Sequence, residues 1–295
     1  MSKFIRTLPS NNQTLRESLY AGDIYLASAN EASFHFVKEV SVLIENELGG
    51  DYRSAHETYS DDAFFEKIGR LRKQIYTSLP FHSLVNHVIS SLGFDLNSQA
   101  YDPARIRVVS HNGHLTPAAA PVYYGHRDTW YSNPQAMITW WVPLHDVRAE
   151  DSFRFYPDYF SRVVQNDSEI FDFDAWTSKD QKKRIGWQNK DTGKTAQYPS
   201  LQQGVSGNSV PVIAKAGEIL LFSGQHLHQT QQNSTGETRF SLDFRTVDLN
   251  DSKNGIGAIN VDNRSTGSSL VQFIRPINST TVNSSKQDLS DADAS

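Results

Sequence analysis

The sequence predicts a mainly β domain of jelly-roll type, a sandwich or barrel, with a layer of N-terminal helices packed on it. Two observations support this prediction. Apolar residues recur every three or four positions up to about residue 100, as in amphipathic helices, and then alternate with polar residues, as in strands. The strand-like segments are also short and separated by turn residues, which favours a sandwich or barrel over a βαβ fold.

Three amphipathic helices are predicted after an N-terminal stretch without clear periodicity. They cover about residues 31–48, 61–79 and 84–92. Asn30 and Ser60 are candidate N-caps for the first two, Gly49 ends the first, and Pro80 ends the second. Because a helix with one apolar face needs a partner surface, we expect all three to pack against the sheet.

The predicted strands all follow residue 100. They cover residues 105–109, 119–124, 135–143, 152–157, 210–213, 217–222, 238–247 and 269–274. The change of period places an N-terminal helical segment at residues 1–100 and a β core at residues 101–280.

A long polar segment interrupts the β core at residues 158–209, with Trp176 and Trp187 as its main apolar anchors. A connection of this length in a compact β domain is often a functional lid, and a surface insertion without function is the alternative. The stretch 281–295, rich in Ser, Asp and Asn, is predicted to be disordered.

Composition excludes several kinds of site. The chain has 295 residues, a formal net charge of −5 and no cysteine, so disulfides, thiolate metal sites and cysteine nucleophiles are excluded. No basic stripe and no long apolar run stand out, and we expect neither a nucleic-acid partner nor a membrane span. The N-terminus shows no signal-peptide pattern, so we expect a cytoplasmic protein.

An imidazole and a carboxylate lie two residues apart in the segment 124–130, at the end of a predicted strand. Residues i and i+2 of a strand point to the same side, so His126 and Asp128 can aim at one point. Two histidines and one carboxylate, with open positions, suit non-haem Fe(II). A single His-x-Asp triplet is weak evidence, since about one is expected by chance in this composition.

Further candidate residues lie in the second half of the chain. A predicted strand at 217–222 is followed by His226 and His228, which point to the same face. The strand at 238–247 then alternates between a polar face, with Arg239 and Arg245, and an apolar face. A face that carries two arginines is either exposed or surrounds an anion, because a buried unpaired guanidinium is very costly.

Together these residues resemble the Fe(II)/2-oxoglutarate-dependent oxygenases, in particular the phytanoyl-CoA-dioxygenase-like branch. That family has a His-x-Asp…His triad, and an arginine about eleven residues after the second histidine, often in an Arg-x-Ser pair. Here His126 and Asp128 match the first two ligands. His228 precedes Arg239 by eleven residues, and Arg239 with Ser241 matches the Arg-x-Ser pair.

The resemblance covers roughly residues 100 to 250 and implies a double-stranded β-helix of the jelly-roll or cupin-like kind. It implies Fe(II), 2-oxoglutarate and O2 as cofactor and co-substrates, with His126, Asp128 and His228 as the catalytic metal ligands. Arg239 would bind the distal carboxylate of 2-oxoglutarate, where bidentate guanidinium pairing suits a carboxylate. Thr139 is a further candidate 2-oxoglutarate contact.

The implied reaction is hydroxylation of an unactivated C–H bond of a small molecule, such as an amino acid or natural-product intermediate, with succinate and CO2 as co-products. Because Asp128 is present, it fills the position that halide takes in related halogenases, so halogenation is not expected. His126-Arg127-Asp128 also matches the kinase His-Arg-Asp loop, but the other kinase motifs are missing.

Two choices of residue stay open at this stage. His228 is preferred to His226 for its spacing to Arg239, and Arg239 is preferred to Arg245. Candidate substrate contacts, each with a solvated or packing role as its alternative, are Trp130, Asn133, Arg105, Arg107, Arg154 and Arg245. A cupin-type metal enzyme that does not use 2-oxoglutarate and a non-catalytic jelly-roll binding protein are the alternative functions.

Overall fold

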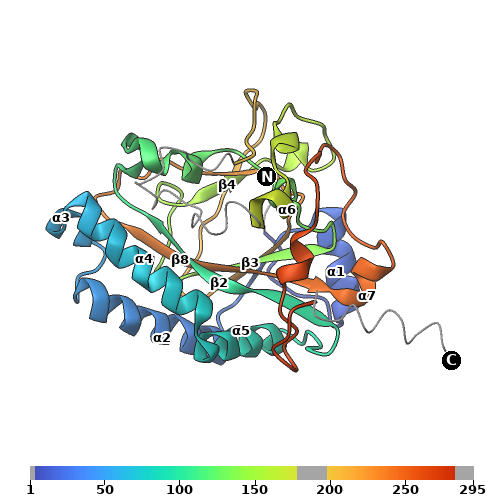
Figure 1. Cartoon of the computed structure of the whole chain (residues 1–295), viewed down its shortest axis with the longest axis horizontal. Helices are drawn as coiled ribbons and strands as arrows, with labels where there is room; N and C mark the ends of the chain where they lie inside the picture. The colour runs from blue at the N-terminus through green and yellow to red at the C-terminus, as the bar shows by residue number, and fades with distance from the viewer. Residues whose placement is uncertain (1–3, 178–197, 283–295) are drawn as a thin grey trace.

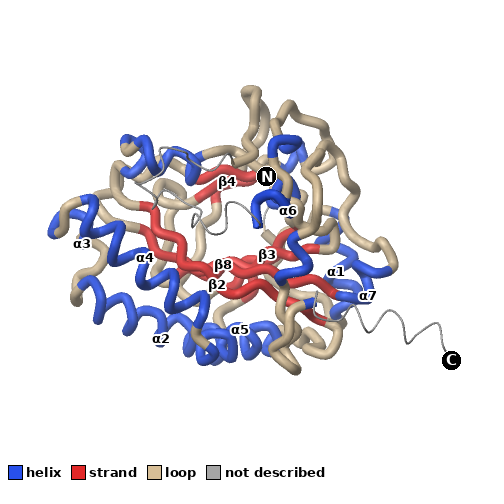
Figure 2. Tube along the Cα trace, viewed as in Figure 1, coloured by secondary structure: helices blue, strands red, loops and turns tan. Residues whose placement is uncertain are grey.

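Two antiparallel sheets lie at the centre of the computed structural model, which describes residues 4–177 and 198–282 (Figures 1 and 2). The larger sheet has the order β1 (Tyr25–Ala27), β6 (Ile219–Ser223), β3 (Met137–Pro143), β8 (Arg239–Asp248) and β2 (Gln99–Val109). The smaller sheet has the order β5 (Val210–Pro211), β4 (Phe153–Phe155) and β7 (His228–Thr230). The expectation of β-sheets with a layer of N-terminal helices packed on them is confirmed, and the sheets are antiparallel.

The helices of the N-terminal region cover the outer face of the larger sheet. In Figure 1, α2, α4 and α5 lie below β2, β8 and β3, whereas β4 lies above them. The α-helices are α1 (Asn12–Ala21), α2 (Glu31–Leu48), α3 (Ala55–Thr58), α4 (Asp61–Thr77), α5 (Leu79–Ser91), α6 (Phe173–Ala175) and α7 (Leu249–Lys253). Among the described residues, no helix is long and apolar enough to cross a membrane.

Side-chain caps begin two of these helices as the sequence predicts. The Asn30 side chain accepts a hydrogen bond from the Ser33 backbone N–H, and Ser60 caps α4 by accepting from Ala63 N–H. Pro80 does not lie beyond a helix but in the first turn of α5, where a missing N–H has no cost. The sequence interpretation missed α1, because its apolar stripe is only Leu15, Leu19 and Tyr20.

The main hydrophobic core fills the space between the helices and the larger sheet. Alternation along β8 directs Phe240, Leu242 and Phe244 into this core, where all three are fully buried. Trp140 of β3 stacks on Phe244 with ring centroids 5.3 Å apart. Burial of such aromatic side chains stabilises the fold by roughly 2–3 kcal/mol each.

A second, smaller core joins the two sheets. It is built from Trp141 of β3, Leu220 and Phe222 of β6, and Phe153 and Phe155 of β4. These residues cover the β3 and β6 half of the inner face of the larger sheet. The β8 and β2 half of the same face is polar, and the candidate site lies there.

Two predicted strands are wrong. Residues 117–123 and 269–272 form 3-10 helices, not the strands expected at 119–124 and 269–274. Pro117 and Pro121 explain the first case, because proline cannot donate to a strand ladder. Part of the predicted lid, residues 178–197, and residues 283–295 of the predicted disordered tail lie outside the described residues. The flanks of the lid segment contain only short helical turns.

Candidate metal centre

Three donor groups from distant parts of the chain meet at one point. The ligating atoms of His126, Asp128 and His228 all lie within 4.8 Å of one another. A two-way backbone pair brings the histidines together, because the N–H of each donates to the carbonyl of the other at 3.0 Å. Their ring centroids are 4.4 Å apart.

The local geometry differs from the strand end that the sequence predicts. A 3-10 helix precedes the motif, and Asp128 begins another at Asp128–Tyr131. Arg127 between the two ligands is nevertheless extended, with φ −106° and ψ 141°. His126 and Asp128 therefore project to the same side, as residues i and i+2 do in any extended backbone.

Hydrogen bonds to backbone carbonyls fix the tautomer of both histidines. His126 Nδ1 donates to the Tyr124 carbonyl at 2.9 Å, and His228 Nδ1 donates to the His226 carbonyl at 3.0 Å. The Nε2 lone pair of each ring is therefore left for a metal ion, the arrangement expected of histidine ligands.

The carboxylate is held in its charged form. Burial alone would raise the pKa of Asp128, but Arg245 and the two histidines outweigh burial and hold this pKa well below its usual value. The Thr139 hydroxyl donates to Asp128 Oδ2 at 2.7 Å and orients the carboxylate. Burial and the neighbouring His126 lower the pKa of His228 to about 4. Asp128 and His228 are thus deprotonated at neutral pH, as metal ligands must be.

His226 lies outside this cluster. Its ring packs on Phe160, with centroids 4.5 Å apart, and on Phe155 at 5.5 Å. Burial, with a contribution from His228, lowers its pKa to about 3. Of the two histidines that the sequence left as alternatives, His228 is the one that joins His126 and Asp128.

Arg239 and Ser241 lie on the polar inner face of β8 with unused donors. Arg239 is 3% exposed, and neither its Nε nor its Nη1 has a hydrogen-bond partner among the described residues. The hydroxyl of Ser241 also has none there. Burial lowers the pKa of Arg239 to about 10. Buried donors without partners are costly, so this pair fits an anionic ligand.

The location of Arg239 connects it to the metal cluster. Alternation along β8 places Arg239, Ser241, Asp243 and Arg245 on one face of the strand. Arg245 lies 3.7 Å from Asp128 of the cluster. The two donors of β8 and the cluster therefore lie on the same side of the larger sheet.

Arg245, by contrast, is already paired. Its guanidinium lies 3.1 Å from Asp102, 3.6 Å from Asp243 and 3.7 Å from Asp128. Burial alone would lower the pKa of Arg245, but the three carboxylates outweigh burial and raise it. Arg245 is thus a counter-ion of the candidate carboxylate ligand, and Arg239 is the better anion receptor of the two.

The other predicted site residues have partners that change their expected roles. The hydroxyl hydrogen of Thr139, a candidate 2-oxoglutarate contact, is used by Asp128. Trp130 is fully buried, and Asn133 donates to the Asp128 carbonyl at 2.8 Å. Both stabilise the loop that carries the candidate ligands His126 and Asp128 (the ligand loop), so we do not expect either to touch a substrate.

The three remaining arginines divide between the two sheets. Arg154 of β4 points away from the space between the sheets, because Phe153 and Phe155 on either side of it occupy the inner core. Arg105 and Arg107 lie on the inner face of β2. Arg107 pairs with Asp243 through contacts of 2.8 and 2.7 Å, and Arg105 pairs with Asp102.

An open cleft of about 680 Å³ is lined by residues that include Tyr76, Pro103, Phe173 and Val271. The Arg105 guanidinium lies over the Tyr76 ring, 5.3 Å from its centroid. None of the three candidate metal ligands lines this cleft, and neither Arg239 nor Ser241 does.

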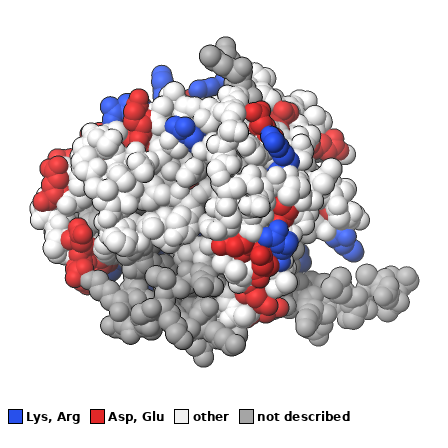
Figure 3. All heavy atoms as spheres, turned by 90° about the horizontal axis from the view of Figure 1, so that it is seen from above, with Lys and Arg blue, Asp and Glu red and all other residues white. Residues whose placement is uncertain are grey.

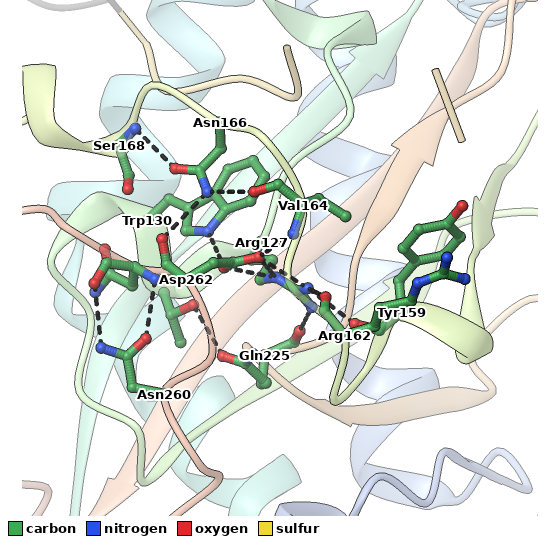
Figure 4. Close-up of polar contacts among 12 residues, drawn as sticks. Arg127, Trp130, Tyr159, Arg162, Val164, Asn166, Ser168, Gln225, Asn260 and Asp262 are labelled. Atoms are coloured by element: carbon green, nitrogen blue, oxygen red, sulfur yellow. Dashed lines mark hydrogen bonds and ion pairs between the residues drawn. The ribbon is translucent and has the colours of Figure 1, made fainter. Parts of the chain in front are cut away.

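Two features of the site were missed from the sequence. Tyr131 packs edge-on against the His126 ring, with centroids 5.5 Å apart, and Asp262 pairs with Arg127 behind the cluster (Figure 4). Tyr131 lies near the motif and could have been named for that reason. Nothing in the sequence singles out Asp262, which lies in a polar loop 134 positions after Asp128.

Charged side chains are scattered on the face shown in Figure 3, where Lys and Arg alternate with Asp and Glu.

No protein-family model matches the chain, and no curated protein matches it. Solved structures do match at low identity, and 2-oxoglutarate or non-haem chemistry appears in the names of several of them.

The structure of EvdO2 from Micromonospora carbonacea var. aurantiaca complexed with 2-oxoglutarate is similar over 83% of this chain and 94% of that chain, with 11% identity and a TM-score of 0.49. The non-heme monooxygenase ThoJ is similar over 79% and 77%, with 12% identity and a TM-score of 0.43. The non-heme alpha ketoglutarate dependent carbocyclase SnoK from nogalamycin biosynthesis is similar over 82% and 87%, with 13% identity and a TM-score of 0.41. Because these TM-scores are below 0.5, the function proposed below rests on the site.

Proposed function

We propose that this protein is an Fe(II)/2-oxoglutarate-dependent oxygenase built on a double-stranded β-helix, and that it hydroxylates an unactivated C–H bond of a small molecule. One observation carries the proposal. A metal-ready cluster of two histidines and one aspartate lies on the same side of the larger sheet as a buried arginine and serine with unused donors. A metal site alone would fit many enzymes, but the two together fit a metal that binds an anionic co-substrate.

The residues of the cluster fit Fe(II). His126 and His228 present Nε2 lone pairs, and Asp128 adds one negative charge in a buried setting. Three ligands on one side of an octahedral ion leave the other side open for co-substrates. When bound there, iron supplies the oxidative chemistry that consumes 2-oxoglutarate and O2 and yields succinate and CO2.

Arg239 and Ser241 supply the second half of the site. A guanidinium presents a planar fork of donors that matches a carboxylate, which a lysine does not. Arg239 Nε and Nη1 and the Ser241 hydroxyl, which have no partner in the part of the chain that the structure describes, can therefore receive the distal carboxylate of 2-oxoglutarate. Burial of Arg239 excludes water and strengthens this charge pairing.

Two further features support oxidation of a small molecule. Asp128 occupies the carboxylate position of the cluster, so a halide has no vacant protein ligand position, and we expect hydroxylation rather than halogenation. Thr139 and Arg245 both hold Asp128 in place, which opposes its loss from the metal.

Anaerobic addition of Fe(II) and then 2-oxoglutarate tests the proposal. A weak metal-to-ligand charge-transfer band in the visible region should develop only when both are present, because it reports chelation of iron by 2-oxoglutarate. Iron binding without this band would favour a cupin-type metal enzyme that does not use 2-oxoglutarate. Absence of iron binding would favour a non-catalytic binding protein and would contradict the proposal.

A further inference from the structure

Arg127, the residue between the two candidate ligands of the His-x-Asp motif, is completely buried. Its side chain is 0% exposed, and that of its partner Asp262 is 1% exposed. The backbone is extended at Arg127, so its side chain points away from the side on which His126 and Asp128 meet. Figure 4 shows it directed at Asp262 and Gln225. The guanidinium therefore lies behind the cluster, in the protein interior.

The guanidinium of Arg127 contacts three other segments of the chain. Its Nε donates to Asp262 Oδ1 at 3.0 Å, and its Nη1 donates to the Gln225 carbonyl at 2.6 Å. Its Nη2 donates to the carbonyls of Tyr159 and Arg162, both at 2.8 Å. These partners lie in the loop before His228, in the segment after β4, and near residue 262.

Asp262 binds the ligand loop a second time. Its Oδ1 accepts a hydrogen bond from Trp130 Nε1 at 2.9 Å, and its Oδ2 accepts from the Val164 N–H at 3.1 Å. Trp130 lies two residues after Asp128, so Asp262 holds the loop on both sides of that ligand (Figure 4).

The loop before His228 is fixed to the same assembly. The Thr129 N–H donates to the Gly224 carbonyl at 3.2 Å. At Gly224 the two loops approach closely, because a Cβ there would lie 2.4 Å from Met137 Cε and 3.3 Å from the Asp128 Cβ, and the Met137 side chain would have to move. Gln225 follows directly and is held by Arg127 through its carbonyl. The loops that carry His126, Asp128 and His228 are thus joined from behind.

We propose that Arg127 and Asp262 form a positioning pair that sets the three candidate ligands in metal-binding geometry. The inference rests on the proposed metal site. A buried ion pair contributes little to stability compared with well-packed apolar residues of similar volume. Its specific effect here is the position of the two loops that carry the candidate ligands, because apolar contacts lack the direction of the hydrogen bonds that a guanidinium and a carboxylate make.

The test uses Co(II) alone as the metal probe, without 2-oxoglutarate or substrate. Its affinity is measured from visible absorption, and the stability of the metal-free protein is measured by urea unfolding. The variants are Arg127→Lys, Asp262→Asn and the double variant Arg127→Met with Asp262→Leu. We expect each to weaken Co(II) binding by roughly 10-fold to 100-fold, the range typical of residues that support metal ligands.

A matched control removes a similar ion pair away from the cluster. Arg16 of α1 pairs with Asp251 of α7 through a 2.6 Å contact, and both side chains are mostly buried. Arg16→Met should lower stability and leave the Co(II) affinity of the folded protein unchanged. The double variant separates the two roles further, because it removes both charges together and should unfold at a higher urea concentration than Asp262→Asn while it still binds Co(II) weakly.

The inference is overturned if the double variant, or either folded single variant, binds Co(II) as tightly as the unmodified protein. It is also overturned if Arg16→Met weakens Co(II) binding as much as Asp262→Asn, since the loss would then reflect stability alone. If the unmodified protein binds no Co(II), the proposed metal site itself is wrong, and that result is distinct from the others.

Discussion

The two faces of β8 differ in what they contribute to the protein. The outer face is apolar and fully buried under the helices; it consists of Phe240, Leu242 and Phe244. The inner face is polar and equally shielded from water over most of its length; it consists of Arg239, Ser241, Asp243 and Arg245. One strand therefore carries a stabilising face and a face whose burial opposes folding.

This difference indicates which buried groups of β8 reduce stability and are available to bind a ligand. Apolar packing on the outer face needs only shape and volume. On the inner face, Arg245 and Asp243 compensate each other, whereas the donors of Arg239 and Ser241 stay without partners among the described residues. Buried polar groups of this kind mark sites that a ligand completes.

Loss of a metal ligand should give the largest effect. His126→Ala and His228→Ala should abolish Co(II) binding, because each removes one of three donors in the cluster. His226→Ala is the matched control, since its ring packs on Phe160 and lies outside the cluster. Calorimetric titration of Co(II) measures the effect. Loss of binding in His226→Ala, with retention in His228→Ala, would reverse the assignment.

A change on the outer face of β8 should affect stability and not the site. Phe244→Ala should lower the free energy of unfolding by about 3–5 kcal/mol, because it leaves a cavity beside Trp140. Urea unfolding measures this loss. The Co(II) affinity of the folded variant should stay unchanged. A large change in Co(II) affinity would show that the two faces are not independent.

A change on the inner face should have the opposite signature. Arg239→Met should weaken 2-oxoglutarate binding to the Fe(II) protein by about 2–3 kcal/mol, or roughly 30-fold to 150-fold, and leave iron binding intact. Its free energy of unfolding should not fall, because its Nε and Nη1 make no hydrogen bond with the described residues that the substitution could break. Arg245→Met is the comparison and should destabilise the protein, since Asp102, Asp128 and Asp243 each lose one cationic partner. Equal 2-oxoglutarate affinity in Arg239→Met would favour Arg245 as the receptor.

Acid should give the smallest effect, in part through His145, which lies in the loop after β3 and contacts the start of β8. His145 Nε2 accepts a hydrogen bond from the Phe240 N–H at 3.0 Å, and burial lowers its pKa from 6.5 to about 4. Between these values the unfolded chain binds the proton and the folded one does not, so stability falls as pH decreases from about 6.5 to 4. At about 1.4 kcal/mol per pH unit, the loss is up to roughly 3 kcal/mol.

Urea unfolding of the metal-free protein at pH 7 and pH 4.5 measures this loss. In His145→Gln, where an amide oxygen can accept the same hydrogen bond without titrating, the loss should be smaller. An identical loss in both proteins would exclude His145 as a source of the pH dependence.

The N-terminal helices and the apolar face of β8 were predicted well from the sequence, because the period of apolar residues directly reports which side chains are buried. The N-caps Asn30 and Ser60 and the alternation of β8 follow from local rules and are found in the structure. The short helix α1 and the 3-10 segment before His126 do not follow from such rules, since their positions depend on tertiary contacts.

The candidate site was only partly predictable. The residue types and spacing named His126, Asp128 and His228, and the structure brings these three together. Which histidine and which arginine face the site depended on pairing across the chain, and no local pattern contains that information. Asp262, which joins the chain behind the cluster, is a polar loop residue without any distinguishing sequence feature.

A crystal structure of the protein with Co(II) and 2-oxoglutarate, grown without oxygen, tests the central claim most directly. We expect the metal on His126 Nε2, His228 Nε2 and Asp128, and the distal carboxylate of 2-oxoglutarate on Arg239 and Ser241. A metal bound elsewhere, or a 2-oxoglutarate carboxylate on Arg245 with Arg239 unoccupied, would contradict the account.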